Sequence, residues 1–263
     1  MTRELVLIGI GAGDPGWLTL EAVAAIRALD VLFVVVKEDE YDEPVSFRRS
    51  LVAQHRPEAS GLRVVELHDP PRPWQTTPDY PAAVRRWRDQ RLAAWSDAVA
   101  THLGAGQVGG FLVWGDPSLY ESTLAIAQQL AAAAPTDAPV ALRVIPGISC
   151  VLALAARHQI PLNRQGRAVQ IAPARLLADG MPADVDDVVV MLDGRQTFAR
   201  IDPTGLDIFW GAYLGTPDEI LLSGPLAEVR DEVLAVRAEA LARKGWMFDT
   251  YLLRRRTHAG HSG

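Results

Sequence analysis

Three glycine-bearing turns, far apart in the chain, carry the residue types that build a small-molecule site. They read Gly-Ile-Gly-Ala-Gly-Asp-Pro over residues 9–15, Trp-Gly-Asp-Pro over 114–117, and Ile-Pro-Gly-Ile-Ser over 145–149. Each turn directly follows a short apolar run, which is the pattern of a strand that ends in a loop. Ligands of open α/β sheets bind outside the carboxyl ends of the strands. The three turns together therefore predict one assembled site for a small molecule.

The first turn also matches a dinucleotide-binding motif. Residues 11–16 spell G-x-G-x-x-G, and the apolar run 31–36 ends near Glu38, where such folds place an acid that binds ribose. Two residues argue against a pyrophosphate ligand. Asp14 would repel the phosphates, and Pro15 lacks a backbone N–H that could cradle them. A zwitterionic or cationic cofactor meets neither objection, and a tight turn that binds no ligand stays open as an alternative.

Composition narrows the class of protein. The 263 residues have a formal net charge of −6, which does not favour a nucleic-acid partner. The single cysteine, Cys150, excludes an internal disulfide, and the six histidines show no spacing typical of metal ligands, so we expect no metal. Neither a signal peptide nor an apolar segment of about 18 residues is evident, so we expect no membrane partner. The sequence thus predicts a cytoplasmic enzyme.

Strand and helix patterns alternate through the first half of the chain, as in an α/β sheet. An acidic loop is expected over 37–44, and a proline-rich excursion over 69–81. The predicted strands are 4–10, 31–36, 62–67, 107–113 and 140–145. The predicted helices are 17–29, 46–55, 82–103, 119–134 and 149–157.

The pattern changes after residues 158–168, which are polar and irregular. Four short strands are expected over 168–171, 188–191, 207–213 and 219–223, followed by an amphipathic helix over 226–244 and a strand over 248–254. We therefore predict an α/β domain over 1–160, a mixed α/β domain over 168–254, and a polar tail over 255–263.

The ordered set G-x-G-x-G-D-P, G-D-P-S-L-Y and I-P-G-I-S resembles the tetrapyrrole methylases, which use S-adenosylmethionine. The resemblance covers nearly the whole chain. It implies two α/β domains with the cofactor and substrate in the cleft between them, and a homodimer. Ala12 stands where the family often has proline, which suggests a less rigid loop here.

Within the family, the segments KEDEYDEP, MLDG and WGAYLGTP resemble enzymes that methylate precorrin-5 at carbon 1 and release acetate. The resemblance implies a cofactor site in which glycines allow close approach and Asp116 meets the amino group or ribose of the cofactor. Asp116 is equally well explained as a helix cap. The implied cofactor residues are Gly11, Ala12, Gly13, Trp114, Gly115, Asp116, Leu119, Ser149, Cys150, Met191, Leu192, Tyr213 and Leu214.

Acetate release is a hydrolysis at an acyl carbon and calls for a general base. Asp193, at a strand end, is the first candidate, although Asp-Gly is also a common turn pair. Tyr120 and Glu38 are further candidates, as are Asp39 and His158. Precorrins carry several carboxylates, which arginines bind well. The arginines expected near the cleft are Arg48, Arg49, Arg164 and Arg195, with Arg167 and Arg175.

Three other functions stay open at the level of sequence. The first is methylation of a different tetrapyrrole carbon. The second is a nicotinamide-dependent oxidoreductase, and the third is a non-catalytic carrier of the tetrapyrrole.

Overall fold

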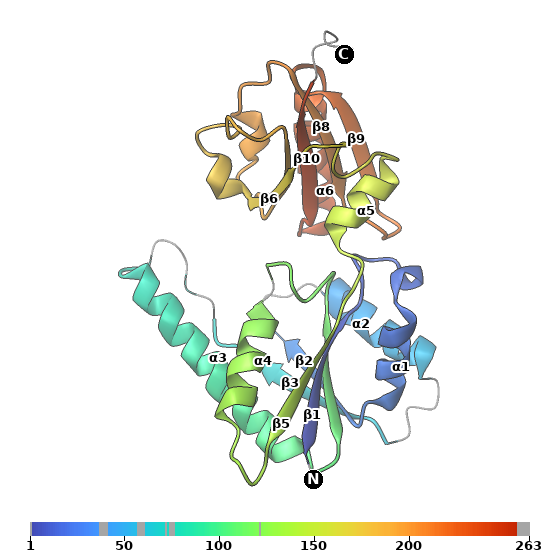
Figure 1. Cartoon of the computed structure of the whole chain (residues 1–263), viewed down its shortest axis with the longest axis vertical. Coiled ribbons are helices and arrows are strands. Elements are labelled where there is room, and N and C mark those ends of the chain that lie inside the picture. The colour runs from blue at the N-terminus through green and yellow to red at the C-terminus, as the bar shows by residue number, and fades with distance from the viewer. Residues whose placement is uncertain are drawn as a thin grey trace. The chain divides into compact units, whose positions relative to one another are not determined.

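The apolar run Leu5–Ile8 is wholly buried at the centre of a parallel sheet, in a computed structural model that describes residues 2–36, 42–56, 61–71, 73, 77–120 and 122–256. Side chains at 42–44 are not described, and Glu38 and Asp39 lie outside the described residues. The chain divides into two compact units, Met1–Ile148 and Ser149–Gly263 (Figure 1). None of the described helices is long and apolar enough to cross a membrane.

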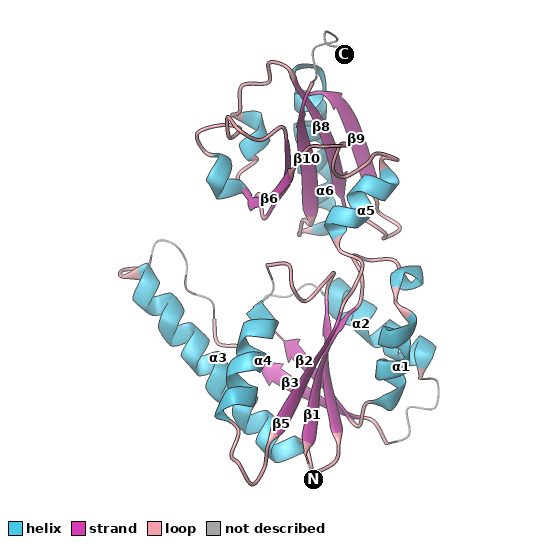
Figure 2. Cartoon of the chain, in the orientation of Figure 1, coloured by secondary structure: helices cyan, strands magenta, loops and turns pink. Residues whose placement is uncertain are grey.

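The first unit holds a five-stranded sheet in the order β3-β2-β4-β1-β5, with all pairs parallel. Helices cover both faces, as Figure 2 shows, which explains why the central strands are apolar throughout. Trp95 and Ile126 pack on one face, and Ile26 and Leu51 on the other. The elements are β1 (Arg3–Gly9), η1 (Pro15–Trp17), α1 (Leu20–Ala28), β2 (Val31–Val36), α2 (Asp42–His55), β3 (Arg63–His68), α3 (Tyr80–His102), β4 (Val108–Val113), α4 (Ser122–Ala133) and β5 (Val140–Ile145).

The strand order separates this unit from the dinucleotide-binding fold. In that fold the first strand lies beside the second, whereas here β4 lies between β1 and β2. The helix after the first turn also begins later than predicted. Asp14 accepts a hydrogen bond from the Gly16 amide and caps only the short η1, and Thr19 caps α1. The G-x-G-x-x-G match therefore does not open a helix, and the dinucleotide interpretation loses its structural basis.

The second unit holds a mixed sheet in the order β6-β7-β10-β8-β9. Only the β6–β7 pair is parallel, and α6 packs against β8 and β9. Its elements are α5 (Cys150–Arg157), β6 (Val169–Pro173), η2 (Ala174–Leu177), β7 (Asp187–Met191), η3 (Thr197–Ala199), β8 (Leu206–Ala212), β9 (Ile220–Pro225), α6 (Leu226–Lys244) and β10 (Asp249–Arg255).

Helix α5 belongs to the second unit, so the first unit ends at Ile148 rather than at the predicted residue 160. The helix packs on β8 and β10. Leu154 is buried against Gly211, where an added Cβ would lie 2.8 Å from the leucine side chain. The alternation of strands and helices continues through α5 and hides this boundary in the sequence.

The sheet directions bring particular strand ends together within each unit. In the first unit β1, β4 and β5 are parallel, so the turns that follow them share one edge. In the second unit β7 and β8 both run antiparallel to β10, so they point the same way and end at one edge. Two loop clusters result, one in each unit.

Candidate functional site

The first two glycine turns are joined by a pair of backbone hydrogen bonds. The Gly115 amide donates to the Gly11 carbonyl at 2.8 Å, and the Gly11 amide donates to the Gly115 carbonyl at 3.2 Å. Both residues have positive φ, +79° at Gly11 and +70° at Gly115, which glycine adopts without strain. The structure therefore confirms that the turns after β1 and β4 lie together.

The third turn packs against the other two so closely that no side chain fits. A Cβ added at Gly147 would lie 2.1 Å from the Gly115 carbonyl oxygen, and one added at Gly9 would lie 2.5 Å from the Gly147 amide nitrogen. Real Cβ atoms do not approach so closely without moving the backbone. Glycine at these two positions is a packing requirement that holds the three turns together.

Asp116 fastens the second turn to the third. One carboxylate oxygen accepts a hydrogen bond from the Gly147 amide at 2.9 Å, and the other accepts from the Ser118 amide at 2.8 Å and from the Ser118 hydroxyl. Burial acts to raise the pKa of Asp116, but these hydrogen bonds outweigh it and hold the pKa below its usual value. The carboxylate thus has a structural task, which competes with the contact to a cofactor that we expected.

Gly115 differs from Gly9, Gly11 and Gly147 because it faces open space. Among the described residues, no heavy atom other than those of its chain neighbours lies within 4 Å of a Cβ added there, although the residue itself is buried. Ala12 and Gly13, in the turn whose Gly11 is hydrogen-bonded to Gly115, are also buried. A glycine with open space where a side chain would stand suits a ligand that approaches the main chain closely.

Two residues that follow the third turn serve the fold as well. Ser149 is the N-cap of α5, and its hydroxyl accepts from the Leu152 amide at 3.4 Å. Burial raises the pKa of the Cys150 thiol to about 11, so it is a thiol and not a thiolate at neutral pH. A protonated, half-buried thiol is a poor nucleophile, so the geometry does not favour covalent chemistry at Cys150.

In the second unit, β7 and β8 are each followed by a non-glycine residue with positive φ. Leu192 has a φ of +58° and Tyr213 a φ of +50°. Such backbone costs about 1–3 kcal/mol and gathers at functional sites. Leu192 is 64% exposed, whereas Tyr213 and Leu214 are buried, and the Tyr213 hydroxyl donates to the Trp246 carbonyl at 2.6 Å. Leu192 is therefore the residue of this edge best placed to touch a ligand, with Met191 half-buried before it.

Asp193 is not the exposed strand-end carboxylate that the sequence suggested. Its side chain is buried, and its two oxygens accept from the Thr197 amide at 2.6 Å, the Thr197 hydroxyl at 2.9 Å, the Tyr251 hydroxyl at 2.7 Å and the Arg195 amide at 3.2 Å. A carboxylate occupied by four donors has little capacity to activate water. The geometry supports the turn interpretation over the general base.

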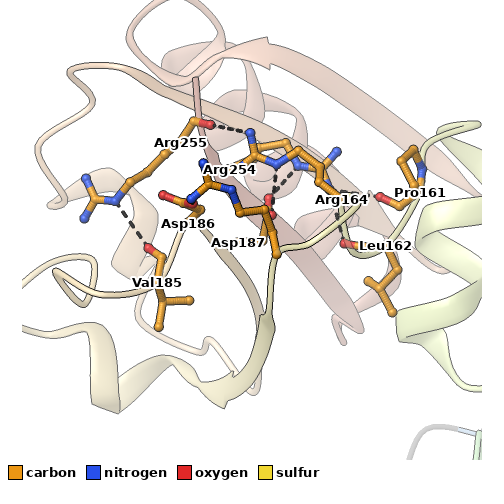
Figure 3. A network of polar contacts seen from close by, with 9 residues as sticks. Pro161, Leu162, Arg164, Val185, Asp186, Asp187, Arg254 and Arg255 are labelled. Atoms are coloured by element: carbon orange, nitrogen blue, oxygen red, sulfur yellow. Dashed lines mark hydrogen bonds and ion pairs between the residues drawn. The ribbon is translucent and has the colours of Figure 1, made fainter. Parts of the chain in front are cut away.

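Arg164 is also placed differently from our expectation. It binds Asp187, which is wholly buried, at 3.0 Å, and Asp187 is shared with Arg254 at 2.6 Å (Figure 3). Asp187 begins β7 and Met191 ends it, so the network lies about 13 Å along the strand from the turn of Leu192. The geometry favours a structural role for Arg164 over contact with substrate.

The remaining candidate arginines lie on the surface or beside it. The Arg48 Nε donates to the Leu112 carbonyl at 3.0 Å, and Arg49 forms an exposed ion pair with Glu66 at 3.1 Å. Arg195 is exposed on the turn that follows Leu192. Arg167 pairs with Asp186 at 2.8 Å in the network of Arg164, and Arg175 is exposed at η2. Arg195 is thus the arginine that shares a turn with a predicted cofactor residue.

The second glycine turn carries the other described candidates. Tyr120 is 46% exposed and has a φ of +50°. Trp114 packs against Phe47 with the ring centroids 5.2 Å apart, and the Leu119 amide donates to the Asp116 carbonyl at 3.2 Å. His158, the last candidate base, lies at the end of α5. Its Nε2 is 3.0 Å from the Trp210 carbonyl oxygen. Burial lowers the pKa of His158, although the hydrogen bond to Trp210 and the charge of Glu219 act to raise it.

Four buried polar residues behind the turn of Leu192 were not predicted. They are Arg237, Asp249, Tyr251 and Thr197. Sequence offers only a weak signal for two of them: Arg237 lies at an apolar position of the α6 helix pattern, and Asp249 begins a strand whose middle residues, Tyr251–Leu253, are apolar.

Comparison with known proteins places this chain in a family. The model of the tetrapyrrole (corrin/porphyrin) methylases matches residues 4–230. Over 253 residues the chain is 40% identical to the precorrin-6A synthase (deacetylating) of a Sinorhizobium species, covering 96% of this chain and 95% of that protein. It is 28% identical over 199 residues to a precorrin-2 C(20)-methyltransferase of Sinorhizobium, covering 73% and 74%.

Solved structures agree with the sequence comparisons. A putative cobalamin synthesis related protein (CobF) from Corynebacterium diphtheriae matches with a TM-score of 0.82 and 32% identity, over 98% of this chain and 100% of that one. The uroporphyrin-III-C-methyltransferase of Thermus thermophilus, at 20% identity and a TM-score of 0.58 over 96% and 92%, shares the fold. This chain, with its joined glycine turns and its two α/β units, belongs to the tetrapyrrole methylases.

Proposed function

We propose that this chain is an S-adenosylmethionine-dependent methyltransferase of cobalamin biosynthesis, which methylates precorrin-5 at carbon 1 and releases acetate to give precorrin-6A. The observation that carries the proposal is the 40% identity to a deacetylating precorrin-6A synthase along almost the full length of both chains. The joined turns of the first unit and the exposed Leu192 turn of the second are the parts of the structure that support it.

The turns of the first unit fit the cofactor. The backbone at Gly115 faces open space among the described residues, and Gly11, Ala12 and Gly13 lie in the turn that is bonded to it. We propose that these residues hold S-adenosylmethionine. The family resemblance adds Leu119, Ser149, Cys150, Met191, Leu192 and Leu214 to the proposed cofactor residues. When bound, the cofactor supplies an electrophilic methyl group.

The residues of the chain have mainly to place two reactants. Most of the rate of such a transfer comes from holding the reacting atoms about 3–3.5 Å apart and in line. The precorrin is an electron-rich enamine system, so its nucleophilic carbon needs no prior deprotonation. Glycine turns locked by Asp116 and by the closed packing at Gly9 and Gly147 provide a rigid support for that placement.

Acetate release needs a proton acceptor for the attacking water and a donor to the acyl oxygen. With Asp193 buried and fully bonded, Tyr120 is the exposed described candidate, and its phenol can donate to the acyl oxygen. Glu38, outside the described residues, stays a candidate for the base. We propose Arg48, Arg49 and Arg195 as partners of the precorrin carboxylates.

The first test is isothermal titration of the protein with S-adenosylhomocysteine and, separately, with NAD⁺. Micromolar binding of the former and none of the latter is expected, followed by formation of precorrin-6A and acetate from precorrin-5. Binding of NAD⁺ alone would overturn the proposal. Tight binding of precorrin-5 without production of S-adenosylhomocysteine would instead indicate a carrier, and a product methylated elsewhere would indicate another methylase.

We also propose a homodimer, which rests on the family resemblance, and a cytoplasmic location, which rests on the composition of the sequence. Light scattering after size exclusion distinguishes a dimer from the 28.6 kDa monomer. A fully active monomer at micromolar concentration would contradict the homodimer but not the proposed reaction.

A further inference from the structure

A network of buried charged and polar groups lies directly behind the exposed turn Leu192–Gln196. It comprises Asp193 on that turn, Arg237 on α6, and Asp249 and Tyr251 on β10. The side chains of Arg237 and Asp249 are 7% and 6% exposed, and Asp193 and Tyr251 are buried. The proposed reaction uses none of them directly, so their presence needs an explanation.

The first half of the network fixes the turn from the inside. Tyr251 donates its hydroxyl to Asp193 at 2.7 Å, and Asp193 in turn holds the Thr197 amide and hydroxyl. The bonds to Thr197 and to the Arg195 amide close the turn, while the bond from Tyr251 ties it to the central strand of the sheet. Burial and the neighbouring Asp193 both raise the pKa of Tyr251, so its hydroxyl stays a donor.

The second half ties the same turn to a helix and to β8. Arg237 donates to the Asp193 carbonyl at 3.3 Å and pairs with Asp249 at 2.8 Å. Asp249 also accepts from the Trp210 indole at 3.1 Å. Next to it, the Phe248 carbonyl accepts from the Tyr213 amide at 2.9 Å. The turns after β7 and β8 are therefore anchored to one cluster.

This arrangement is costly compared with an apolar core. Two carboxylates and a guanidinium have lost most of their water, and such buried ion pairs are often less stable than apolar side chains of equal volume. The turn that the cluster supports adds strain, because Leu192 and Gln196 have φ of +58° and +49°. Stability alone therefore does not account for the cluster, whereas a requirement for one fixed turn geometry does.

We propose that Tyr251 and Arg237 are positioning residues of the methyltransferase: acting through Asp193, they hold the turn Leu192–Gln196 in the shape that contacts the cofactor and presents Arg195 to the substrate. The inference rests on the proposed function. It gives Asp193 the task of a support, in place of the general base, and assigns a role to two residues far from the turn in sequence.

The test compares Tyr251→Phe with Thr250→Val. Tyr251→Phe removes only the hydroxyl bound to Asp193 and keeps the ring, which packs edge-on against Phe198 at 5.3 Å. Thr250→Val is the matched control, because it removes a buried hydroxyl of the same strand whose bond, to the Val190 carbonyl of β7 at 2.9 Å, lies outside the turn Leu192–Gln196. Tyr251→Phe loses a buried hydrogen bond to a carboxylate and Thr250→Val loses one to a carbonyl, so both variants should have a lower free energy of unfolding, and Tyr251→Phe the lower of the two.

The two variants should differ in ligand binding. In Tyr251→Phe we expect the dissociation constant of S-adenosylhomocysteine and the KM for S-adenosylmethionine to rise about tenfold, because a turn that is no longer held in one shape must be ordered when the ligand binds. In Thr250→Val both constants should stay within about twofold of the parent. Arg237→Lys keeps the charge but not both contacts, and should also raise the two constants if it folds.

Equal ligand affinities in folded Tyr251→Phe and Thr250→Val would overturn the inference. So would a Tyr251→Phe variant that loses stability but binds like the parent. Failure of the parent protein itself to bind S-adenosylhomocysteine would instead contradict the proposed function, so the two failures are distinguishable in the same titrations.

Discussion

Glycines that look equivalent in the sequence have different tasks in the structure. Gly9 and Gly147 are closed in by backbone, whereas Gly115 opens onto space that a ligand can fill. Gly115→Ala should therefore lower the affinity for S-adenosylhomocysteine at least tenfold, because its methyl group enters that space. It should also cost about 1–2 kcal/mol of stability through the positive φ. Titration and chemical denaturation measure the two effects.

Gly166→Ala is a matched control for that change. Gly166 has the same φ of +70° and likewise no described heavy atom within 4 Å of an added Cβ, but it lies in the loop before β6. It should lose the same stability and no affinity. If both variants bind the ligand as the parent does, Gly115 does not face the cofactor.

Leu192 offers a test in the opposite direction. The residue combines a positive φ with a largely exposed apolar side chain, and neither feature helps the fold. Leu192→Gly relieves the strain, although glycine also gains entropy in the unfolded chain, so the melting temperature should be unchanged or higher. Binding of S-adenosylhomocysteine should weaken several-fold. A variant that loses stability and keeps affinity would show that Leu192 packs and does not bind.

At the scale of elements, the sequence predicted the strands β2 and β5 and the helix α6 at their observed bounds, because charged residues flank the apolar run of β2 and Gly or Pro flanks β5 and α6. It placed the start of α1 too early, since Asp14 and Pro15 look like a helix start while Thr19 is the actual cap. The burial of polar side chains was harder to predict than the bounds of the elements. Asp193 and Arg164 are strand-end and loop residues by pattern, and only tertiary partners such as Tyr251 and Asp187 show that they are enclosed.

A buried ion pair anchors the residue that follows β3 to helix α3, and its loss can be predicted. Arg91 on α3 pairs with Asp69 at 2.8 Å, both almost wholly buried, and donates to Ser122 at the start of α4. Arg91→Met leaves a buried carboxylate without its cation and should lower the free energy of unfolding by about 3–5 kcal/mol. Arg49→Met, which breaks the exposed pair with Glu66, should cost under about 1 kcal/mol. Urea denaturation distinguishes these outcomes, and similar losses in both would contradict the buried anchor.

At the scale of the whole molecule, the two units should respond differently to acid. His158 belongs to the second unit, and its burial holds the pKa below the usual value near 6.5. The unfolded chain therefore binds a proton before the folded one does. The stability from neutral His158 is complete above about pH 6.5 and is lost as the pH falls through the folded pKa.

Asp116 acts in the first unit over a lower range of pH. Its folded pKa is also below the usual value, near 3.9, so the stability from its carboxylate is present above that pH and is lost only as the pH falls further. Hydrogen exchange measured from pH 7 down to about pH 2 should thus show protection decreasing first in Ser149–Gly263 and only later in Met1–Ile148. His158→Gln should abolish the early decrease and leave the later one. If both units lose protection together in the parent and in the variant, the units do not titrate independently and the acid response belongs to the molecule as one cooperative body.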